Sequence, residues 1–423
     1  MYSYKNKTLY WQNDSLTEVA AQAEQLLKEK YAYEGAYYLY SMDVFRSQIG
    51  KLKQNLPQSR FFYSVKSQSH SVFLSEIDKH ENFGFDVVSG GEIYRTQAIN
   101  IDPRKIVFAG VGKTKQEIHI ALQLGIYAFH VESISELKAI AEQAKSLNKI
   151  APVTLRMNPE IEVDTHKYIT TGMHENKFGI NVSEFADALE FCKQDESLHL
   201  IGLQAHLGSQ LLDETVYEKA LLKLESLGLA AKQAGCPVQY YSLGGGFGID
   251  YETDADSKPH REFALDRLQV KLKPYFQKGI QIDFEPGRFL SAYSGILVTH
   301  VLYTKQKQGF TIAIVDAGMN DFIRPALYEA NHPILPETDS KNRSLYDIVG
   351  PVCESGDFFR KKIMMPKLSP GDRLFLLHAG AYGQVMSSTY NSRPMLPEVL
   401  LDKGHIHIIS RPGFYSDLLV REV

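Results

Sequence analysis

The chain carries four kinds of group that could do chemistry, each placed just after a short apolar run. Lys66 follows the run Phe61–Val65, and His206 closes another such run. The glycine-rich segment Gly244–Gly248 and the carboxylate of Glu285 come at the ends of two more. An amine, an imidazole, a row of backbone amides and a carboxylate are groups that could together hold a planar, phosphorylated cofactor.

Lys66 is the candidate nucleophile. An amine that leaves water beside an apolar strand has its ammonium form disfavoured, so its pKa falls and it becomes able to form a Schiff base. A solvated lysine in a loop is the alternative, and the residue taken alone favours that alternative.

The segment Gly244–Gly248 is a candidate anion cradle. Three consecutive glycines expose successive backbone amides without side chains in the way, which suits a phosphate; a flexible turn is the alternative. The spacing does not fit the dinucleotide fingerprint G-x-G-x-x-G. A second glycine-containing segment, Gly110–Thr114, imitates a P-loop, but Val107 stands where the first glycine is required. We therefore exclude both nucleotide-binding motifs.

His206 and Glu285 each allow two interpretations. His206 could be a satisfied core histidine, or its ring could stack on a planar cofactor while Ser209 offers a hydroxyl to the cofactor phosphate. Glu285 could pair with Arg288, or it could face the protonated pyridine nitrogen of pyridoxal phosphate (PLP) and let that ring act as an electron sink. Taken together with Lys66 and the glycines, these residues predict a PLP site.

The elements that must position these residues form a regular series. Eight apolar or β-branched runs alternate with helical stretches, a pattern typical of a (β/α)8 barrel of about 250 residues. An open doubly wound sheet would alternate in the same way, but the number eight favours the barrel. Because chemistry gathers at the C-terminal ends of barrel strands, the four candidate groups should meet at one mouth. The expected strands are Phe61–Val65, Phe85–Val88, Ile106–Ala109, Ile126–Val131, Pro152–Met157, Leu200–His206, Gln239–Leu243 and Ile280–Glu285.

Capping boxes predict helix starts at Thr114–Glu117 and Ser133–Glu136. After about residue 290 the pattern changes to strands and turns, which predicts a second, all-β domain. We therefore expect an N-terminal segment, 1–35, that packs on either domain, a PLP-binding barrel over 36–290, and a β-rich domain over 291–423. The strands expected in the last domain are Ile296–Tyr303, Phe310–Asp316, Tyr346–Val349, Arg373–His378 and Ile406–Ile409.

Composition limits the classes of function. The 423 residues are 44% hydrophobic and 23% charged, with a formal net charge of −4, which gives no electrostatic reason to expect a nucleic acid or an anionic membrane as partner. No apolar run approaches the roughly 20 residues that span a bilayer. Three widely separated cysteines suit a reducing, cytoplasmic location. Neither a CxxC pair nor an HExxH helix supports a metal site.

A series of motifs in chain order resembles the alanine-racemase-like (fold type III) PLP-dependent decarboxylases, and its C-terminal members resemble the branch of that family that acts on diaminopimelate. The resemblance covers nearly the whole chain. The barrel motifs are Tyr63-Ser-Val-Lys66, Gly84-Phe-Asp-Val-Val-Ser-Gly-Gly-Glu92, Glu175-Asn-Lys-Phe-Gly179, His206-Leu-Gly-Ser-Gln210, Gly244-Gly-Gly-Phe-Gly248 and Glu285-Pro-Gly-Arg288. The C-terminal motifs are Asp316-Ala-Gly-Met-Asn-Asp321, Ile323-Arg-Pro-Ala-Leu-Tyr328, Gly350-Pro-Val-Cys-Glu-Ser-Gly-Asp357, Gly380-Ala-Tyr-Gly383 and Met386-Ser-Ser-Thr-Tyr-Asn-Ser-Arg-Pro394.

The resemblance implies a role for each matching residue. Lys66 would carry PLP, His206 would stack on its ring, and Glu285 would pair with its pyridinium. Cys353 would donate the proton that replaces CO2, although taken alone Cys353 would more often be a buried small hydrophobe. The family's Cys353-Glu354 segment reaches the neighbouring subunit's site, so a homodimer with shared active sites is implied. The other implied cofactor contacts are Ser209, Gly246 and Tyr382 at the phosphate, with Gly287 and Arg288 beside them.

The expected substrate is meso-2,6-diaminopimelate, which would be converted to L-lysine and CO2 in the last step of lysine biosynthesis. Its distal carboxylate calls for fixed, planar cations. Arg288 and Arg324, with Tyr328 and Tyr382, match the family's substrate contacts, and Glu354 would take the distal ammonium. An ordinary surface or interdomain ion pair is the alternative for Arg324.

Two further functional hypotheses stay open. One is decarboxylation of another basic amino acid or polyamine precursor, namely ornithine, lysine or carboxynorspermidine. The other is a non-catalytic PLP-binding homologue, against which the joint presence of Lys66, Cys353 and Glu285 argues. The chain departs from the family at Ser67-Gln68, where alanine and asparagine are usual, and this leaves the fine positioning of Lys66 open.

Overall fold

The computed structural model describes residues 2–159, 161, 177–252 and 263–423. These residues fall into two compact units. The barrel unit consists of the described residues of Gly50–Ile249 and Phe263–Phe289. The β-rich unit consists of those of Met1–Ile49, Asp250–Glu262 and Leu290–Val423. No helix in the described parts of the chain has the length and apolar character needed to cross a membrane.

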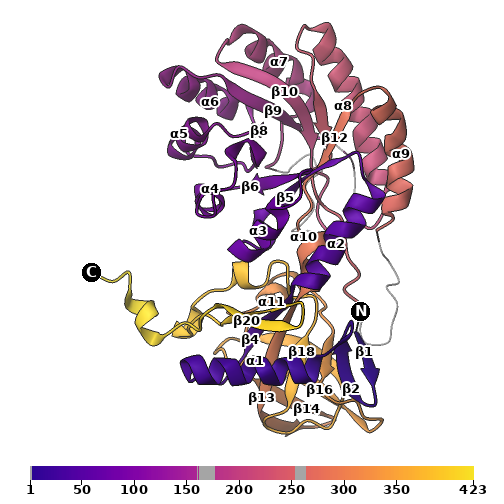
Figure 1. The fold of residues 1–423 in the computed structure, drawn as a ribbon, viewed down its shortest axis with the longest axis vertical. Coiled ribbons are helices and arrows are strands. Elements are labelled where there is room, and N and C mark those ends of the chain that lie inside the picture. The colour runs from indigo at the N-terminus through magenta and orange to yellow at the C-terminus, as the bar shows by residue number, and fades with distance from the viewer. Residues whose placement is uncertain (1, 160, 162–176, 253–262) are drawn as a thin grey trace. The chain divides into compact units, whose positions relative to one another are not determined.

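Eight parallel strands close into a barrel in the order in which they occur in the sequence, and helices surround them (Figure 1). The barrel closes where β12 pairs with β5, with Phe284 opposite Phe61. The predicted (β/α)8 barrel is thereby confirmed. Its strands are β5 (Arg60–Ser64), β6 (Phe83–Val87), β7 (Ile106–Phe108), β8 (Ala128–Val131), β9 (Ala151–Met157), β10 (Leu198–Ala205), β11 (Tyr240–Ser242) and β12 (Gln281–Phe284). The helices that follow are α3 (Ser71–Asp78), α4 (Gly90–Gln97), α5 (Lys115–Leu124), α6 (Ile134–Ser146), α7 (Phe185–Gln194), α8 (Thr215–Gln233), α9 (Leu265–Gln277) and α10 (Arg288–Ser291).

The predicted helix starts occur where the capping residues stand. Thr114 and Glu117 form a reciprocal capping box at the start of α5. At α6 the Ser133 hydroxyl accepts the Glu136 N–H, but the Glu136 carboxylate accepts the backbone N–H of Glu132, one residue earlier than a capping box requires. The face of α6 expected to be apolar is buried, through Leu137, Ile140, Ala141 and Ala144.

The β-rich unit is built on a large mixed sheet whose main path runs β17-β16-β14-β13-β4-β19-β20, with β18 and β15 branching from β13. A small three-stranded sheet, β1-β2-β3, precedes the helix α1. The strands are β1 (Tyr2–Lys5), β2 (Thr8–Trp11), β3 (Asp14–Ser15), β4 (Tyr37–Ser41), β13 (Gly295–Lys307), β14 (Phe310–Val315), β15 (Ile334–Pro336), β16 (Arg343–Val349), β17 (Phe358–Pro366), β18 (Arg373–Leu376), β19 (Glu398–Asp402) and β20 (His405–Ser410). The helices are α1 (Leu16–Tyr31), α2 (Met42–Asn55), which continues into the barrel unit, and α11 (Arg324–Tyr328).

Strand β4 differs from the expected domain division, which assigned residues from 36 onward to the barrel. It pairs antiparallel with β13 and parallel with β19, so residues 37–41 belong to the sheet of the β-rich unit. All five of its residues are buried, and a fully buried strand reads as a continuous apolar run in either kind of sheet. Local sequence therefore could not decide which sheet it joins.

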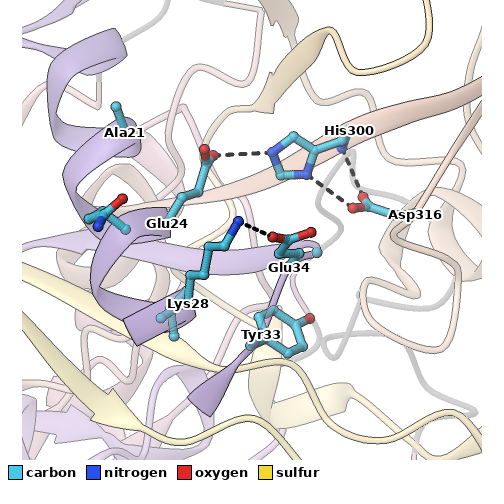
Figure 2. A pocket seen from close by; sticks show the side chains of 10 residues that line it. Ala21, Glu24, Lys28, Tyr33, Glu34, His300 and Asp316 are labelled. Atoms are coloured by element: carbon cyan, nitrogen blue, oxygen red, sulfur yellow. Dashed lines mark hydrogen bonds and ion pairs between the residues drawn. The ribbon is translucent and has the colours of Figure 1, made fainter. Parts of the chain in front are cut away.

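Helix α1 packs on the β-rich unit, against β2 and β20, and a charged cluster fastens it to the sheet (Figure 2). The imidazole of His300 lies 3.1 Å from the carboxylate of Glu24 on α1 and 3.0 Å from that of Asp316. Lys28 pairs with Glu34 at 2.6 Å. These residues line a cavity of about 440 Å³. Because each charged group in its wall is already paired with another, we interpret the cluster as a fastening of α1 to the sheet.

Candidate active site

The C-terminal ends of neighbouring barrel strands hold the predicted residues. Lys66 lies in a short 3-10 turn, Val65–Ser67, directly after β5. His206 follows β10, Gly244 is the second residue after β11, and Glu285 follows β12. Because β10, β11, β12 and β5 are consecutive neighbours in the closed barrel, these groups occupy one side of a single mouth, as the strand pattern predicted.

Lys66 stands beside a buried carboxylate that sequence reasoning did not single out. Its Nζ lies 3.6 Å from the Oδ2 of Asp86, and its side chain is 41% exposed whereas that of Asp86 is 1% exposed. The hydroxyl of Ser64 donates to the same oxygen at 2.7 Å. Burial raises the pKa of Asp86, and the charge of Lys66 opposes that rise. Asp86 thus holds the lysine amine at the mouth; its position inside the motif Gly84–Glu92 was the available signal.

Ser67 and Gln68, which depart from the family pattern, support the turn that carries Lys66. The Ser67 hydroxyl donates to the carbonyl of Ser64 at 2.9 Å, and the Tyr63 hydroxyl donates to the carbonyl of Gln68 at 2.9 Å. The side-chain oxygen of Gln68 accepts the backbone N–H of His70 at 2.9 Å. Both substituted residues are therefore engaged in local hydrogen bonds that shape the turn carrying Lys66.

Glu285 is buried among donors. Its carboxylate accepts a hydrogen bond from the hydroxyl of Ser242 at 2.7 Å and two from the amide of Gln204, at 2.9 and 3.0 Å. Burial raises its pKa, and these hydrogen bonds act in the opposite direction. Sequence reasoning missed both donors, which lie within strands where a polar residue can equally face either side of the barrel wall.

His130, at the end of β8, is a second missed residue. Its Nδ1 lies 3.3 Å from the Oε1 of Glu285, but the contact is not aligned as a hydrogen bond, and neither ring nitrogen has a hydrogen-bond partner among the described residues. Burial lowers the pKa of His130 to about 4. The ring is therefore neutral at pH 7 and adds no positive charge beside Glu285.

His206 is held in one tautomer by the glycine-rich turn. The backbone N–H of Gly245 donates to the Nδ1 of His206 at 3.1 Å, so Nδ1 carries no proton and the neutral ring has its proton on Nε2. Burial lowers the pKa of His206 well below its ordinary range. A flat, uncharged imidazole is suited to stacking on a planar ring.

The turn itself requires glycine. A Cβ at Gly245 would lie 2.3 Å from the carbonyl oxygen of Glu285, and one at Gly246 would lie 2.6 Å from that of Gly208. Gly246 has a φ of +100°, which side-chain-bearing residues rarely adopt. The Ser209 hydroxyl accepts a hydrogen bond of 2.9 Å from the guanidinium of Arg288. A Cβ at Gly287 would come within 3.0 Å of Ser64 and Ser67.

A second group of predicted residues gathers around Arg324 in the β-rich unit. Arg324 begins α11 and is 5% exposed. Its guanidinium lies 5.3 Å from the ring of Tyr251, 5.7 Å from that of Tyr328 and 6.0 Å from that of Tyr382. Its Nε donates to the Nε2 of His332 at 3.2 Å. Arg324 is thus a buried cation inside an aromatic cage, and Tyr251 and His332 are additional members that sequence reasoning missed.

Cys353 and Glu354 lie on an exposed turn of the β-rich unit. Cys353 is not the buried small hydrophobe that its residue type alone would favour. Its backbone N–H donates to the side-chain oxygen of Asn391 at 2.9 Å. Of the expected motif Glu175–Gly179, the first two residues lie outside the described part of the chain.

The residues at the barrel mouth fit PLP. They supply an amine, a neutral imidazole, a buried carboxylate and a turn in which every added Cβ would meet backbone atoms. Residues 42–292 match the family described as pyridoxal-dependent decarboxylase, pyridoxal binding domain. The chain belongs to this family of PLP-dependent decarboxylases and is an enzyme of the carboxy-lyase class.

Relatives that align with nearly the whole chain are diaminopimelate decarboxylases. The chain is 39% identical over 423 residues to the diaminopimelate decarboxylase of Haemophilus influenzae, covering 100% of this chain and 99% of the relative. It is 37% identical over 414 residues to that of Aquifex aeolicus, covering 98% and 95%. The crystal structure of diaminopimelate decarboxylase from Helicobacter pylori complexed with L-lysine is similar with a TM-score of 0.86 at 38% identity, covering 93% of this chain and 98% of that one.

Proposed function

We propose that the protein removes one carboxylate of meso-2,6-diaminopimelate as CO2 and places a proton on the same carbon, giving L-lysine in the last step of lysine biosynthesis. The relatives just described carry that activity in their names, and one was solved with L-lysine bound. The observation that carries the proposal is the buried guanidinium of Arg324 inside its aromatic cage. A fixed planar cation suits a substrate with a second, distal carboxylate, which ornithine and lysine lack.

At the barrel mouth, PLP when bound supplies an electron sink for the pair left by CO2. Lys66 is the residue we expect to carry the cofactor, because its amine alone among the candidates can attach to an aldehyde. Glu285, whose carboxylate accepts hydrogen bonds from Ser242 and Gln204, would face the pyridine nitrogen, and neutral His206 would stack on the ring. The remaining proposed cofactor contacts are Ser209, Gly246, Gly287, Arg288 and Tyr382.

For the substrate, we assign the distal carboxylate to Arg288, Arg324 and Tyr328, with Tyr382 as a further substrate contact. Glu354 would pair with the distal ammonium, and its exposed position on the turn leaves its carboxylate accessible to a ligand. Ornithine and lysine would satisfy Glu354 but offer no distal carboxylate to the planar guanidinium groups. The assignment therefore predicts discrimination against both.

Cys353 is our proposed proton donor. Its exposure, together with that of Glu354, supports a role at a site completed by a second subunit, so we propose a homodimer with shared active sites. All three cysteines are free, which is consistent with our expectation of a cytoplasmic enzyme.

The test is product formation by the PLP-loaded protein offered meso-diaminopimelate, ornithine, lysine and carboxynorspermidine in parallel. We expect lysine and CO2 from diaminopimelate, with the others untouched. Turnover of ornithine alone would keep the decarboxylase chemistry but refute the substrate roles of Arg324 and Glu354. CO2 from none of the four would favour a PLP-binding homologue without this activity.

A further inference from the structure

The turn that carries Cys353 and Glu354 is closed by one carboxylate. Asp357, only 5% exposed, accepts the backbone N–H of Val352 on Oδ2 at 2.6 Å. Its Oδ1 accepts the backbone N–H of Met319 at 2.7 Å. The Asp357 side chain thus holds two parts of the turn 350–357 together and links the turn to the neighbouring loop that follows β14.

The two ends of the turn also contact each other. The backbone N–H of Gly350 donates to the carbonyl of Asp357 at 3.2 Å. A Cβ at Gly350 would lie 2.4 Å from the Asp357 carboxylate, so glycine is required there for the carboxylate to reach the backbone amides. Burial raises the pKa of Asp357, while the two backbone N–H donors lower it.

A second side chain holds the turn at Cys353 itself through a hydrogen bond. The side-chain oxygen of Asn391 accepts the Cys353 backbone N–H at 2.9 Å. Asn391 has a φ of +57°, a left-handed conformation that asparagine and aspartate tolerate better than other residues with side chains. The backbone of the turn is therefore fixed from both sides, whereas the side chains of Cys353 and Glu354 remain exposed.

We propose that Asp357 and Asn391 are positioning residues that orient the Cys353 thiol, so that its proton reaches a single face of the carbon from which CO2 has left. This inference rests on the proposed function, because it assumes that Cys353 is the proton donor. A rigid backbone with exposed side chains is what a donor needs when a misplacement of about 1 Å can cost about a hundredfold in rate.

The variants Asp357→Asn and Asn391→Ala test the hydrogen bonds that Asp357 and Asn391 accept from the turn. An amide at 357 can accept only one of the two backbone N–H groups, because its NH2 group cannot accept, and alanine at 391 accepts none. The reaction is run in D2O, so that the carbon that loses CO2 becomes a CHD centre in the product. We expect wild-type enzyme to give one configuration at that centre. Both variants should give a mixture of configurations and a kcat lowered about 10- to 100-fold.

Matched controls separate positioning from general damage to the fold. Asn391→Asp keeps an acceptor oxygen and a residue type that tolerates positive φ, so it should retain a single configuration. Asp347 also accepts a backbone N–H, from Lys362 at 2.8 Å, but lies on β16 outside the turn. Asp347→Asn should therefore leave kcat and configuration as in wild type. If Asp357→Asn does not fold, comparison of Asn391→Ala with Asn391→Asp still shows whether the acceptor at position 391 controls the configuration of the product.

The outcomes distinguish this inference from the proposed function. Wild-type rate and a single configuration in both Asp357→Asn and Asn391→Ala would overturn the inference. Wild-type behaviour of Cys353→Ala would overturn the donor role on which it rests. A third readout needs no turnover: the alkylation rate of Cys353 in a Cys236→Ser background, where buried Cys192, its pKa raised to about 12 by burial, stays unreactive. We expect Asp357→Asn to change that rate severalfold; an unchanged rate would also count against the inference.

Discussion

The backbone N–H of Gly245 donates a hydrogen bond of 3.1 Å to the Nδ1 of His206. This contact joins the glycine-rich turn after β11 to the imidazole after β10, so the two parts of the proposed cofactor site are positioned by one another. It also fixes the protonation state of the ring, because a nitrogen that accepts an N–H cannot carry a proton itself.

The first prediction concerns that turn. Gly245→Ala would place a Cβ 2.3 Å from the Glu285 carbonyl oxygen, so the turn must shift away from both Glu285 and His206. We expect the Kd for PLP, measured by absorbance titration of the apoprotein, to rise at least about tenfold. Gly112→Ala is the control, because a Cβ at Gly112 meets no atom within 4 Å. An equal Kd in the two variants would contradict the argument.

The second prediction concerns Lys66. Lys66→Ala removes the only group proposed to attach to the cofactor, and we expect turnover of diaminopimelate to fall at least about a thousandfold. Lys115→Ala, which removes another exposed lysine of the barrel unit, should retain full activity. CO2 release by Lys66→Ala at the wild-type rate would remove Lys66 from its proposed role.

The barrel could be predicted from the sequence because the patterns that indicate its strands and helices lie in short, local segments. Each of the eight apolar runs lies between helical stretches, several of which begin at a capping residue, and most of the parallel strands pair with their neighbours in sequence order. The residues at their ends then share one mouth. Gln204, Ser242 and His130 were missed because a strand exposes alternate residues to opposite faces, and the pattern does not say which polar residue faces Glu285.

The β-rich unit could be predicted only in part. Strand β4 pairs with β19, more than 350 residues later in the chain, and no local pattern encodes such a partner. Strand β17 contains Arg360, Lys361 and Lys362, which interrupt its apolar character, so it was not expected as a strand. The cage around Arg324 includes Tyr251, which is distant in sequence, and only the folded chain shows that it belongs there.

A third prediction tests the cage. Arg324→Lys keeps the positive charge but loses the planar, two-pronged donor that matches a carboxylate. We expect the KM for diaminopimelate to rise about 10- to 100-fold and kcat to change much less, measured by steady-state CO2 release. Arg104→Lys, which changes an exposed arginine of the barrel unit, should leave KM unchanged. A wild-type KM in Arg324→Lys would exclude Arg324 as a substrate contact.

A fourth prediction tests Glu354. Glu354→Asp keeps the charge but shortens the side chain by one methylene, so a carboxylate that pairs with the distal ammonium would be displaced. The KM for diaminopimelate should rise about tenfold, while cofactor binding stays as in wild type. The exposed residue Glu81, in the barrel unit, provides a matched Glu→Asp control. If KM does not respond, Glu354 does not contact the substrate.

The last prediction concerns stability against pH. Burial acts to lower the pKa of His300, but hydrogen bonds and charge from Asp316 and Glu24 raise it from 6.5 to about 9. A raised pKa means that the folded state holds the proton more tightly, so this stabilisation is complete below pH 6.5 and is lost as pH rises through 9. Burial acts to raise the pKa of Glu24, but His300 and Arg373 lower it from 4.5 to about 2. That contribution is complete above pH 4.5 and is lost as pH falls through 2.

The fastening of α1 (Figure 2) should therefore be strongest between pH 4.5 and 6.5. His300→Gln should lower the free energy of unfolding by about 2 kcal/mol at pH 6, a value reduced for the partial exposure of the ring. The difference from wild type should vanish by pH 9.5, as followed by thermal denaturation of the PLP-loaded proteins at several pH values. His407→Gln, at an exposed position of β20 in the same unit, should show no such trend. A difference between His300→Gln and wild type that stays constant from pH 6 to 9.5 would mean that the charge on His300 does not hold α1 to the sheet.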